Sequence, residues 1–181
     1  MRVRENDINK YLIILLSLSA VIRAVLASII ELGNDEVYYW TYALYPDWSH
    51  FDHPPMVGWF IQLFSCNLLL SSEFFIRLSS VIIMTITTYI VYLIGKQVKD
   101  EQTGFYAALL YTASFYAFVI TGVFILPDTP LTFFMFMGVL QFIKYFKGSK
   151  NKNLLLAGLF TGLAILSKYT GVFIWLGVGL Y

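Results

Sequence analysis

Apolar residues dominate this chain in long runs that short polar segments separate. A helix needs about 20 apolar residues to cross about 30 Å of hydrocarbon. Five runs approach that length, and each predicts a membrane-spanning helix: Tyr11 to Ile30, Phe74 to Ile94, Phe105 to Leu126, Leu131 to Phe146 and Leu154 to Tyr181. The pattern therefore predicts an all-α, polytopic bundle of about five transmembrane helices.

Residues 32–73 are predicted to form an external loop that contains interfacial helices. Within this loop, the stretch from Met56 to Leu70 is apolar but short, and it carries polar residues such as Gln62 and Asn67. It predicts an interfacial or re-entrant helix, with a true span as the alternative. The last apolar run contains Lys168 in its interior. That run predicts either one long helix or one helix followed by the start of another.

The composition agrees with a membrane protein. Hydrophobic residues make up 59% of the chain and charged residues 13%, with a mean hydropathy of +0.72. Soluble domains have a charged share of about a quarter. We expect residues 1–181 to form one transmembrane domain, surrounded by membrane lipids and without a nucleic-acid partner. The single cysteine, Cys66, can form no internal disulfide.

The N-terminus allows two interpretations. Arg2, Arg4 and Lys10 precede the first apolar run, as they would in a signal peptide cleaved near Val25 and Ala27. Arg23 lies inside the run, however, and the run is long, which favours an uncleaved first helix.

The charges predict the orientation. If the N-terminus is cytoplasmic and the spans alternate, nine of the twelve basic residues lie on the cytoplasmic side, as the positive-inside rule requires: Arg2, Arg4, Lys10, Lys96, Lys99, Lys144, Lys147, Lys150 and Lys152. Both histidines and seven of the eleven acids then face outward: Glu31, Asp35, Glu36, Asp47, Asp52, Glu73 and Asp128. We expect a plasma (inner) membrane protein whose active-site loops are external or periplasmic.

The adjacent pair Asp35 and Glu36 is the first candidate for chemistry. Keeping two acids dehydrated beside a bilayer is costly, so the pair indicates a substrate site. The structural alternatives are that Asp35 caps the following aromatic helix and that Glu36 is an exposed first-turn acid favoured by the helix dipole. Tyr38 and its aromatic neighbours are either interfacial anchors or residues that stack on a sugar or line a lipid.

His53 precedes two prolines, which impose an extended backbone on it and suit a helix starting at Met56. With His50 and Asp52, His53 could supply ligands for a divalent metal ion. The pattern His-x-Asp-His is weak evidence for a metal site by itself.

Asp128 lies between two prolines in a link between two spans. It either caps a helix that begins at Thr129 or Pro130, or joins Asp35 at a shared outer site. Lys168 should approach the outer interface, where it either extends to lipid phosphates or binds the phosphate of a lipid-linked substrate. Arg77 allows the same two interpretations, with Glu73 as a partner one helical turn away.

Four motifs occur in a specific order: Asn34-Asp35-Glu36-Val37-Tyr38-Tyr39-Trp40, Phe51-Asp52-His53-Pro54-Pro55, Leu126-Pro127-Asp128-Thr129-Pro130 and Leu166-Ser167-Lys168-Tyr169. This order resembles the polyprenyl-phosphate-sugar glycosyltransferases of the GT-C fold. The resemblance is to the branch with protein O-mannosyltransferases, lipid A aminoarabinose transferases and bacterial lipopolysaccharide sugar transferases. Since such enzymes are several times longer, the chain is expected to be the N-terminal part of a larger module or a truncated reading frame.

The resemblance implies a role for each motif. It implies that Asp35 is the general base, that Glu36 helps to bind the acceptor, and that Asp128 is an acid of the same cavity. Asp52 and His53 take the place of an acid and a basic residue that bind a metal and the donor phosphate. A neutral imidazole, however, has no fixed charge at pH 7.

Lys168 matches a lysine of this branch, with a carrier-phosphate or a structural role. The implied reaction moves a sugar from a polyprenyl-phosphate donor to a lipid, glycan or protein acceptor, with inversion at the anomeric carbon. The alternatives from other classes are a truncated, non-catalytic membrane protein and a transporter or flippase subunit.

Overall fold

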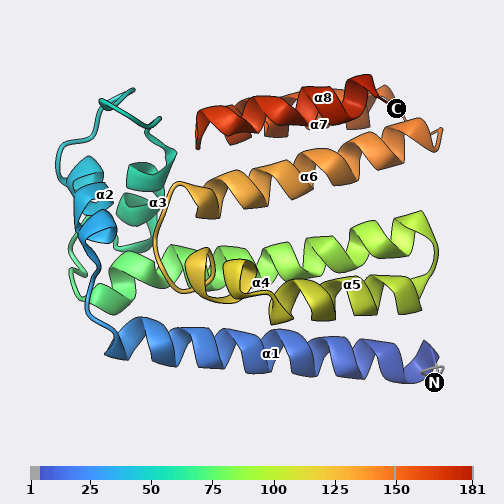
Figure 1. The fold of residues 1–181 in the computed structure, drawn as a ribbon, viewed down its shortest axis with the longest axis horizontal. Coiled ribbons are helices and arrows are strands. Elements are labelled where there is room, and N and C mark those ends of the chain that lie inside the picture. Colours follow the sequence, from blue (N-terminus) through green and yellow to red (C-terminus); the bar gives the residue numbers. More distant parts are fainter. Residues whose placement is uncertain (1–4, 149, 181) are drawn as a thin grey trace.

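The structure, a computed structural model, describes residues 5–148 and 150–180, and all its regular elements in these residues are helical. Arg2, Arg4 and Tyr181 lie outside them. Among the described residues, three helical segments are long and apolar enough to cross a membrane: Asp7–Ile29, Glu73–Val98 and Asp128–Phe146. These ranges belong to α1 (Glu5–Ile29), α4 (Glu73–Val98) and α6 (Asp128–Phe146), which lie side by side with the remaining long helices in one bundle (Figure 1). The predicted all-α membrane bundle is confirmed.

The predicted span from Phe105 to Leu126 is wrong as a single helix. Helix α5 (Glu101–Ala113) ends before Ser114, whose ψ of 135° is extended. A single turn of π-helix, Tyr116–Ile120, follows and leads into a loop that reaches α6. The segment therefore approaches the outer end of the bundle as a broken helix.

The last apolar run forms two helical parts, the second of the two expected arrangements. Helix α7 (Asn151–Ile165) ends shortly before Lys168, whose backbone is extended at φ −158° and ψ 138°. A 3-10 turn (Tyr169–Phe173) and the short α8 (Ile174–Gly179) then run back along the bundle (Figure 1). The reversal is tight, because a Cβ at Gly171 would lie 2.6 Å from the carbonyl carbon of Ala164.

The helices sort the charged segments to two ends of the bundle. The start of α1 and the α4–α5 and α6–α7 connections, which carry residues such as Lys99 and Lys150, lie at one end (Figure 1). Helices α2 (Asn34–Leu44) and α3 (Met56–Phe64) and the link into α6 lie at the other. Asp35 and Asp128 therefore belong to the same end, as the charge pattern predicts.

Helix α3 is shorter than expected. It ends at Phe64, and the chain then turns through left-handed backbone at Cys66, Asn67 and Leu68, with φ of 53°, 57° and 63°. Nine residues rise about 13 Å, which is too short for a span. The length of α3 therefore fits the prediction of an interfacial or re-entrant helix. Cys66, in the turn after it, is free and exposed.

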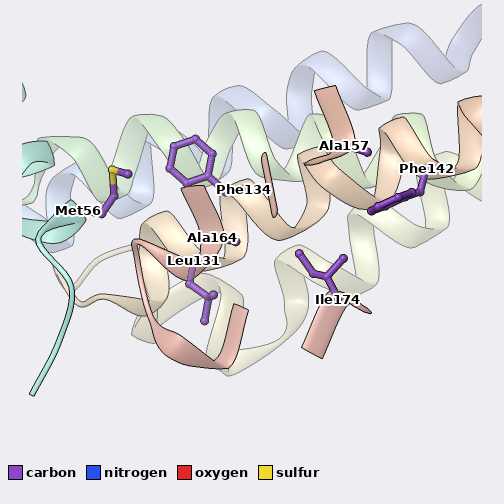
Figure 2. Close-up of a cluster of buried hydrophobic side chains, with 7 residues drawn as sticks. All are labelled: Met56, Leu131, Phe134, Phe142, Ala157, Ala164 and Ile174. Carbon is purple, nitrogen blue, oxygen red and sulfur yellow. The ribbon is translucent and has the colours of Figure 1, made fainter. Parts of the chain in front are cut away.

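Two apolar clusters hold the outer loops against the long helices. The cluster in Figure 2 joins α3 to α6, α7 and α8 through Met56, Leu131, Phe134, Phe142, Ala157, Ala164 and Ile174. A second joins α2 and α3 to α4 and the link before α6 through Tyr42, Ala43, Val57, Ile61, Ile76 and Ile125. A Cβ at Gly58 would lie only 2.8 Å from that of Tyr42, so α2 and α3 approach closely there. Packing therefore fixes the loops that carry the candidate site.

Candidate functional site

Glu36 and Arg77 form a buried ion pair at the outer end of the bundle. Nε and Nη2 of Arg77 donate to the two carboxylate oxygens of Glu36 at 2.7 and 2.6 Å, and the two residues are 0% and 3% exposed. The arginine also donates to the carbonyls of Ala27, Ile30 and Glu31 at the end of α1. Because a guanidinium has five N–H donors, it can hydrogen-bond to both carboxylate oxygens and to the unpaired carbonyls at the end of α1 at the same time.

The carboxylate of Glu36 also accepts backbone hydrogen bonds from both outer loops. The N–H of Gly33 donates to it at 3.0 Å, and the N–H of Ile125 at 3.1 Å. Both structural alternatives are therefore wrong: Glu36 is not an exposed first-turn acid, and Arg77 pairs with Glu36 rather than with Glu73. The pair fastens α1, α2, α4 and the link before α6 to one another.

Asp35, unlike its neighbour, is exposed. Helix α2 begins at Asn34 with Gly33 in the capping position, so the structural alternative, in which Asp35 caps this helix, is wrong. The residue lies in the first turn, on a cavity of about 580 Å³. Both outer loops line this cavity: Ile30, Glu31, Gly33, Asn34, Asp35, Glu36, Ile120, Phe124 and Leu126.

Asp52 is held by two tyrosines of α2. Its Oδ1 accepts from the hydroxyls of Tyr42 at 2.5 Å and Tyr38 at 2.9 Å. Nδ1 of His53 lies 3.3 Å from Oδ2 of Asp52, without the angles of a hydrogen bond. The ring of His50 stacks on Tyr42 with centroids 3.6 Å apart. Tyr38, expected to bind substrate, thus contacts Asp52 and is itself exposed.

These contacts set the proton affinities of the cluster. The hydrogen bond from Tyr42 is the largest of the effects that lower the pKa of Asp52, followed by the bond from Tyr38 and the charge of His53. Burial and the same hydrogen bond raise the pKa of Tyr42. Asp52 is therefore a carboxylate, and Tyr42 a neutral phenol, at neutral pH.

The expected metal ligands do not form a metal site by themselves. Among the described residues, no group of three or more His, Cys, Asp or Glu side chains is placed to hold an ion together. Asp52 and His53 supply two neighbouring groups, fewer than the three protein ligands of a typical catalytic zinc site.

Asp128 bonds to Tyr116 and Lys168 rather than to its own helix. Helix α6 begins at Asp128 without a side-chain cap, so the capping alternative is wrong. The hydroxyl of Tyr116 donates to Oδ1 at 2.8 Å, and Nζ of Lys168 lies 3.1 and 2.9 Å from the two oxygens. Lys168 does not extend to lipid phosphates as its structural alternative suggested.

The negative charges of three acids, Asp35, Asp52 and Asp128, all act on the hydroxyl group of Tyr39. Its pKa is raised to about 12, first by burial and then by the negative charges of Asp52, Asp35 and Asp128. All three carboxylates therefore act on one phenol of α2. Asp35 and Asp52 belong to the first outer loop and Asp128 to the second, so both loops contribute acids near Tyr39.

A comparison with models of protein families shows to which family this chain belongs. Residues 52–181, well over half of the chain, match the family model of dolichyl-phosphate-mannose-protein mannosyltransferases. The chain belongs to this family. Family membership confirms the resemblance to GT-C enzymes and makes this a membrane glycosyltransferase sequence of the mannosyltransferase type, with a lipid-linked sugar donor and an acceptor implied in general. The chain matches no curated protein and no solved structure significantly.

The family match includes Asp52, His53, Asp128 and Lys168 but begins after Asp35 and Glu36. Sequence reasoning missed the partners of these residues rather than the residues themselves. One signal was present, since Tyr38 and Tyr42 are four residues apart and share one face of a helix. No local signal indicated that Arg77 reaches Glu36 or that Lys168 reaches Asp128, because both pairs join distant segments.

Proposed function

We propose that this chain carries the outer-face catalytic loops of a membrane enzyme that transfers a sugar from a polyprenyl-phosphate donor to a lipid, glycan or protein acceptor. The observation that carries the proposal is the position of Asp35, which is exposed on a cavity of about 580 Å³ lined by both outer loops. Its neighbour Glu36 is fully engaged in the ion pair with Arg77. The two acids of the pair thus have different surroundings and different roles.

Asp35 acts as the general base. It takes the proton of the acceptor hydroxyl while that oxygen attacks the anomeric carbon, and the polyprenyl phosphate leaves from the opposite face, with inversion. Glu36 and Arg77 are positioning residues that fix the first turn of α2 and hence the direction of Asp35. Since Asp35 lies before the residues that match the family, this role rests on the cavity geometry.

The leaving phosphate needs positive charge rather than a proton. Lys168 is half-buried and bound to Asp128, so a phosphate dianion would compete with that carboxylate for the lysine. A protonated His53, which lies next to Asp52, would add a second cation. Tyr38 lies on the same cluster and offers an aromatic face to the sugar.

We place these loops on the external or periplasmic face of the plasma membrane, with the N-terminus in the cytoplasm. Support comes from the separation of lysine-rich connections and acidic loops to opposite ends of the bundle. On that face, a donor linked to a lipid is available without a soluble nucleotide.

The test is Asp35→Asn in the full-length protein, with transfer from a polyprenyl-phosphate sugar measured in reconstituted membranes. Loss of a positioned general base should reduce kcat by about 10²-fold or more. The matched control is Asp47→Asn, which changes an exposed acid on the same loop. A full rate for Asp35→Asn, or an equal loss for Asp47→Asn, would remove Asp35 from this role.

A further inference from the structure

Arg23 is a buried cation inside the first span, and the proposed chemistry does not use it. Its side chain is 0% exposed, and it lies about 9 Å of helix before Ile29, the end of α1. An ionisable side chain inside a membrane is costly and usually marks a functional element. Its partners therefore indicate what it does.

The guanidinium of Arg23 holds the π-turn that interrupts the segment after α5. Nη2 donates to the carbonyl of Ala117 at 3.3 Å, and the guanidinium carbon lies 5.0 Å from the ring centroid of Phe118. Nε and Nη1 have no hydrogen-bond partner. A Cβ at Gly122 would lie 2.6 Å from Nε and would also collide with the carbonyl of Phe118. Only a glycine at this position leaves space for the guanidinium.

The same π-turn carries a residue of the candidate site. Tyr116 is its first residue, and the N–H of Thr121 donates to the Tyr116 carbonyl at 3.0 Å. The hydroxyl of Tyr116 donates to Asp128 at 2.8 Å. At the other end of the turn, Oγ1 of Thr129 donates to the carbonyl of Thr121 at 3.0 Å. The turn is thus fixed by Arg23 on its membrane side and by the neighbour of Asp128 on its outer side.

We propose that Arg23 is a positioning residue for the outer site: it holds the π-turn so that Tyr116 binds Asp128, which in turn binds Lys168. Stability alone explains the arginine poorly, because burying a charge whose nitrogens are only partly hydrogen-bonded costs free energy. The inference rests on the proposed function for its kinetic readout, but not for its spectroscopic one.

The kinetic test compares Arg23→Met, Tyr116→Phe and their combination in the full-length protein. Misplacement of a catalytic constellation by about 1 Å can reduce the rate by about 10²-fold, so Arg23→Met should lower kcat by that order while KM for the acceptor changes little. Because Arg23 acts through Tyr116, the double variant should lose no more than the more impaired of the two single variants. Additive losses would overturn the inference.

A second variant leaves the arginine in place, in case Arg23→Met does not fold. Gly122→Ala adds one methyl group that collides with the guanidinium and with the carbonyls of Phe118 and Ala117, so it disturbs the contact between Arg23 and the turn from both sides, whereas a Cβ at Gly158 meets no atom within 4 Å. Only Gly122→Ala should reproduce the kinetic loss, and Gly158→Ala is the matched control.

The spectroscopic readout does not depend on sugar transfer. The ¹⁹F resonance of 3-fluorotyrosine at position 116 should move in Asp128→Asn, which changes its hydrogen bond, and in both Arg23→Met and Gly122→Ala, but not in Gly158→Ala. A resonance that stays unchanged in Arg23→Met or in Gly122→Ala would overturn the inference whatever reaction the protein catalyses. If the resonance moves while Asp35→Asn transfers at the full rate, the proposed function fails and the positioning role stands.

Discussion

Lys168 and Asp128 form an ion pair between the break after α7 and the first residue of α6, with Nζ 2.9 Å from Oδ2 and 3.1 Å from Oδ1. Their side chains are 30% and 20% exposed, so the pair is partly shielded from water. The pair keeps a cation beside Asp128 at the outer end of the bundle. An anion that enters this region meets a lysine that is already oriented.

Replacing Lys168 should weaken binding of the donor more than it slows the chemical step. A hydrogen bond to a charged group is worth about 1.5–3 kcal/mol, so Lys168→Gln should raise KM for the polyprenyl-phosphate sugar by about 10-fold or more. Lys168→Arg should retain much of the affinity, because it keeps the charge. The measurement is a donor titration in reconstituted membranes.

The matched control for this prediction is Lys150→Gln, which removes an exposed lysine at the opposite end of the bundle. Its KM for the donor should equal that of the unmodified protein. An unchanged KM in Lys168→Gln would assign the lysine a structural role, in which its bond to Asp128 only ties α7 to α6.

The sequence predicted the helical class and the sorting of charges because both depend on local patterns. Apolar runs at span length predict α1, α4 and α6 directly. The run from Phe105 to Leu126 has the same composition, yet it breaks at Ser114. The turn after this break is contacted by Arg23 of α1 and Thr129 of α6, which lie outside the run, so a pattern within the run could not reveal these partners.

The candidate site was predictable as a set of residues but not as a set of contacts. Asp35 and Glu36 are adjacent acids and look equivalent in the sequence. The structure separates them, because Arg77 from α4 and the N–H of Ile125 occupy one carboxylate and leave the other exposed. These partners are 41 and 89 positions away from Glu36 in the chain, so the spacing of residues within one helix cannot predict them.

The ion pair of Glu36 and Arg77 should dominate the stability of the outer end. Arg77→Met leaves a buried carboxylate without its counter-ion, which typically costs about 3–5 kcal/mol. The expected result is a large drop in Tm of the detergent-solubilised protein. In the combination with Glu36→Gln, part of the loss should be recovered, since the uncompensated charge is then removed.

Glu73→Gln is the control for this stability prediction. Glu73 lies one helical turn from Arg77 in the sequence but is not its partner, so its replacement should stay within about 0.5 kcal/mol of the unmodified protein. If Glu73→Gln destabilises as much as Glu36→Gln, the arginine exchanges between the two acids in solution, and the buried pair does not hold the loops together.

The Asp52 cluster should make the outer loop sensitive to acid. The pKa of Asp52 is lowered in the folded state, mainly by the hydrogen bond from Tyr42, relative to an ordinary value of about 3.9. A group with a lowered pKa stabilises the fold fully above that ordinary value, and this contribution is lost as the pH falls through the folded-state pKa. The unmodified protein should therefore lose more Tm between about pH 5 and pH 3 than Asp52→Asn does.

Tyr42→Phe tests the cause of this acid sensitivity. It removes the strongest hydrogen bond to Asp52, so the pKa of the carboxylate should rise toward its ordinary value and the acid-dependent part of Tm should shrink. Tyr45→Phe is the matched control, since Tyr45 follows α2 and is 76% exposed. Equal pH profiles for the unmodified protein and Tyr42→Phe would mean that the short hydrogen bond does not stabilise the ionised carboxylate. The charge of His53 and the bond from Tyr38 would then have to account for the lowered pKa.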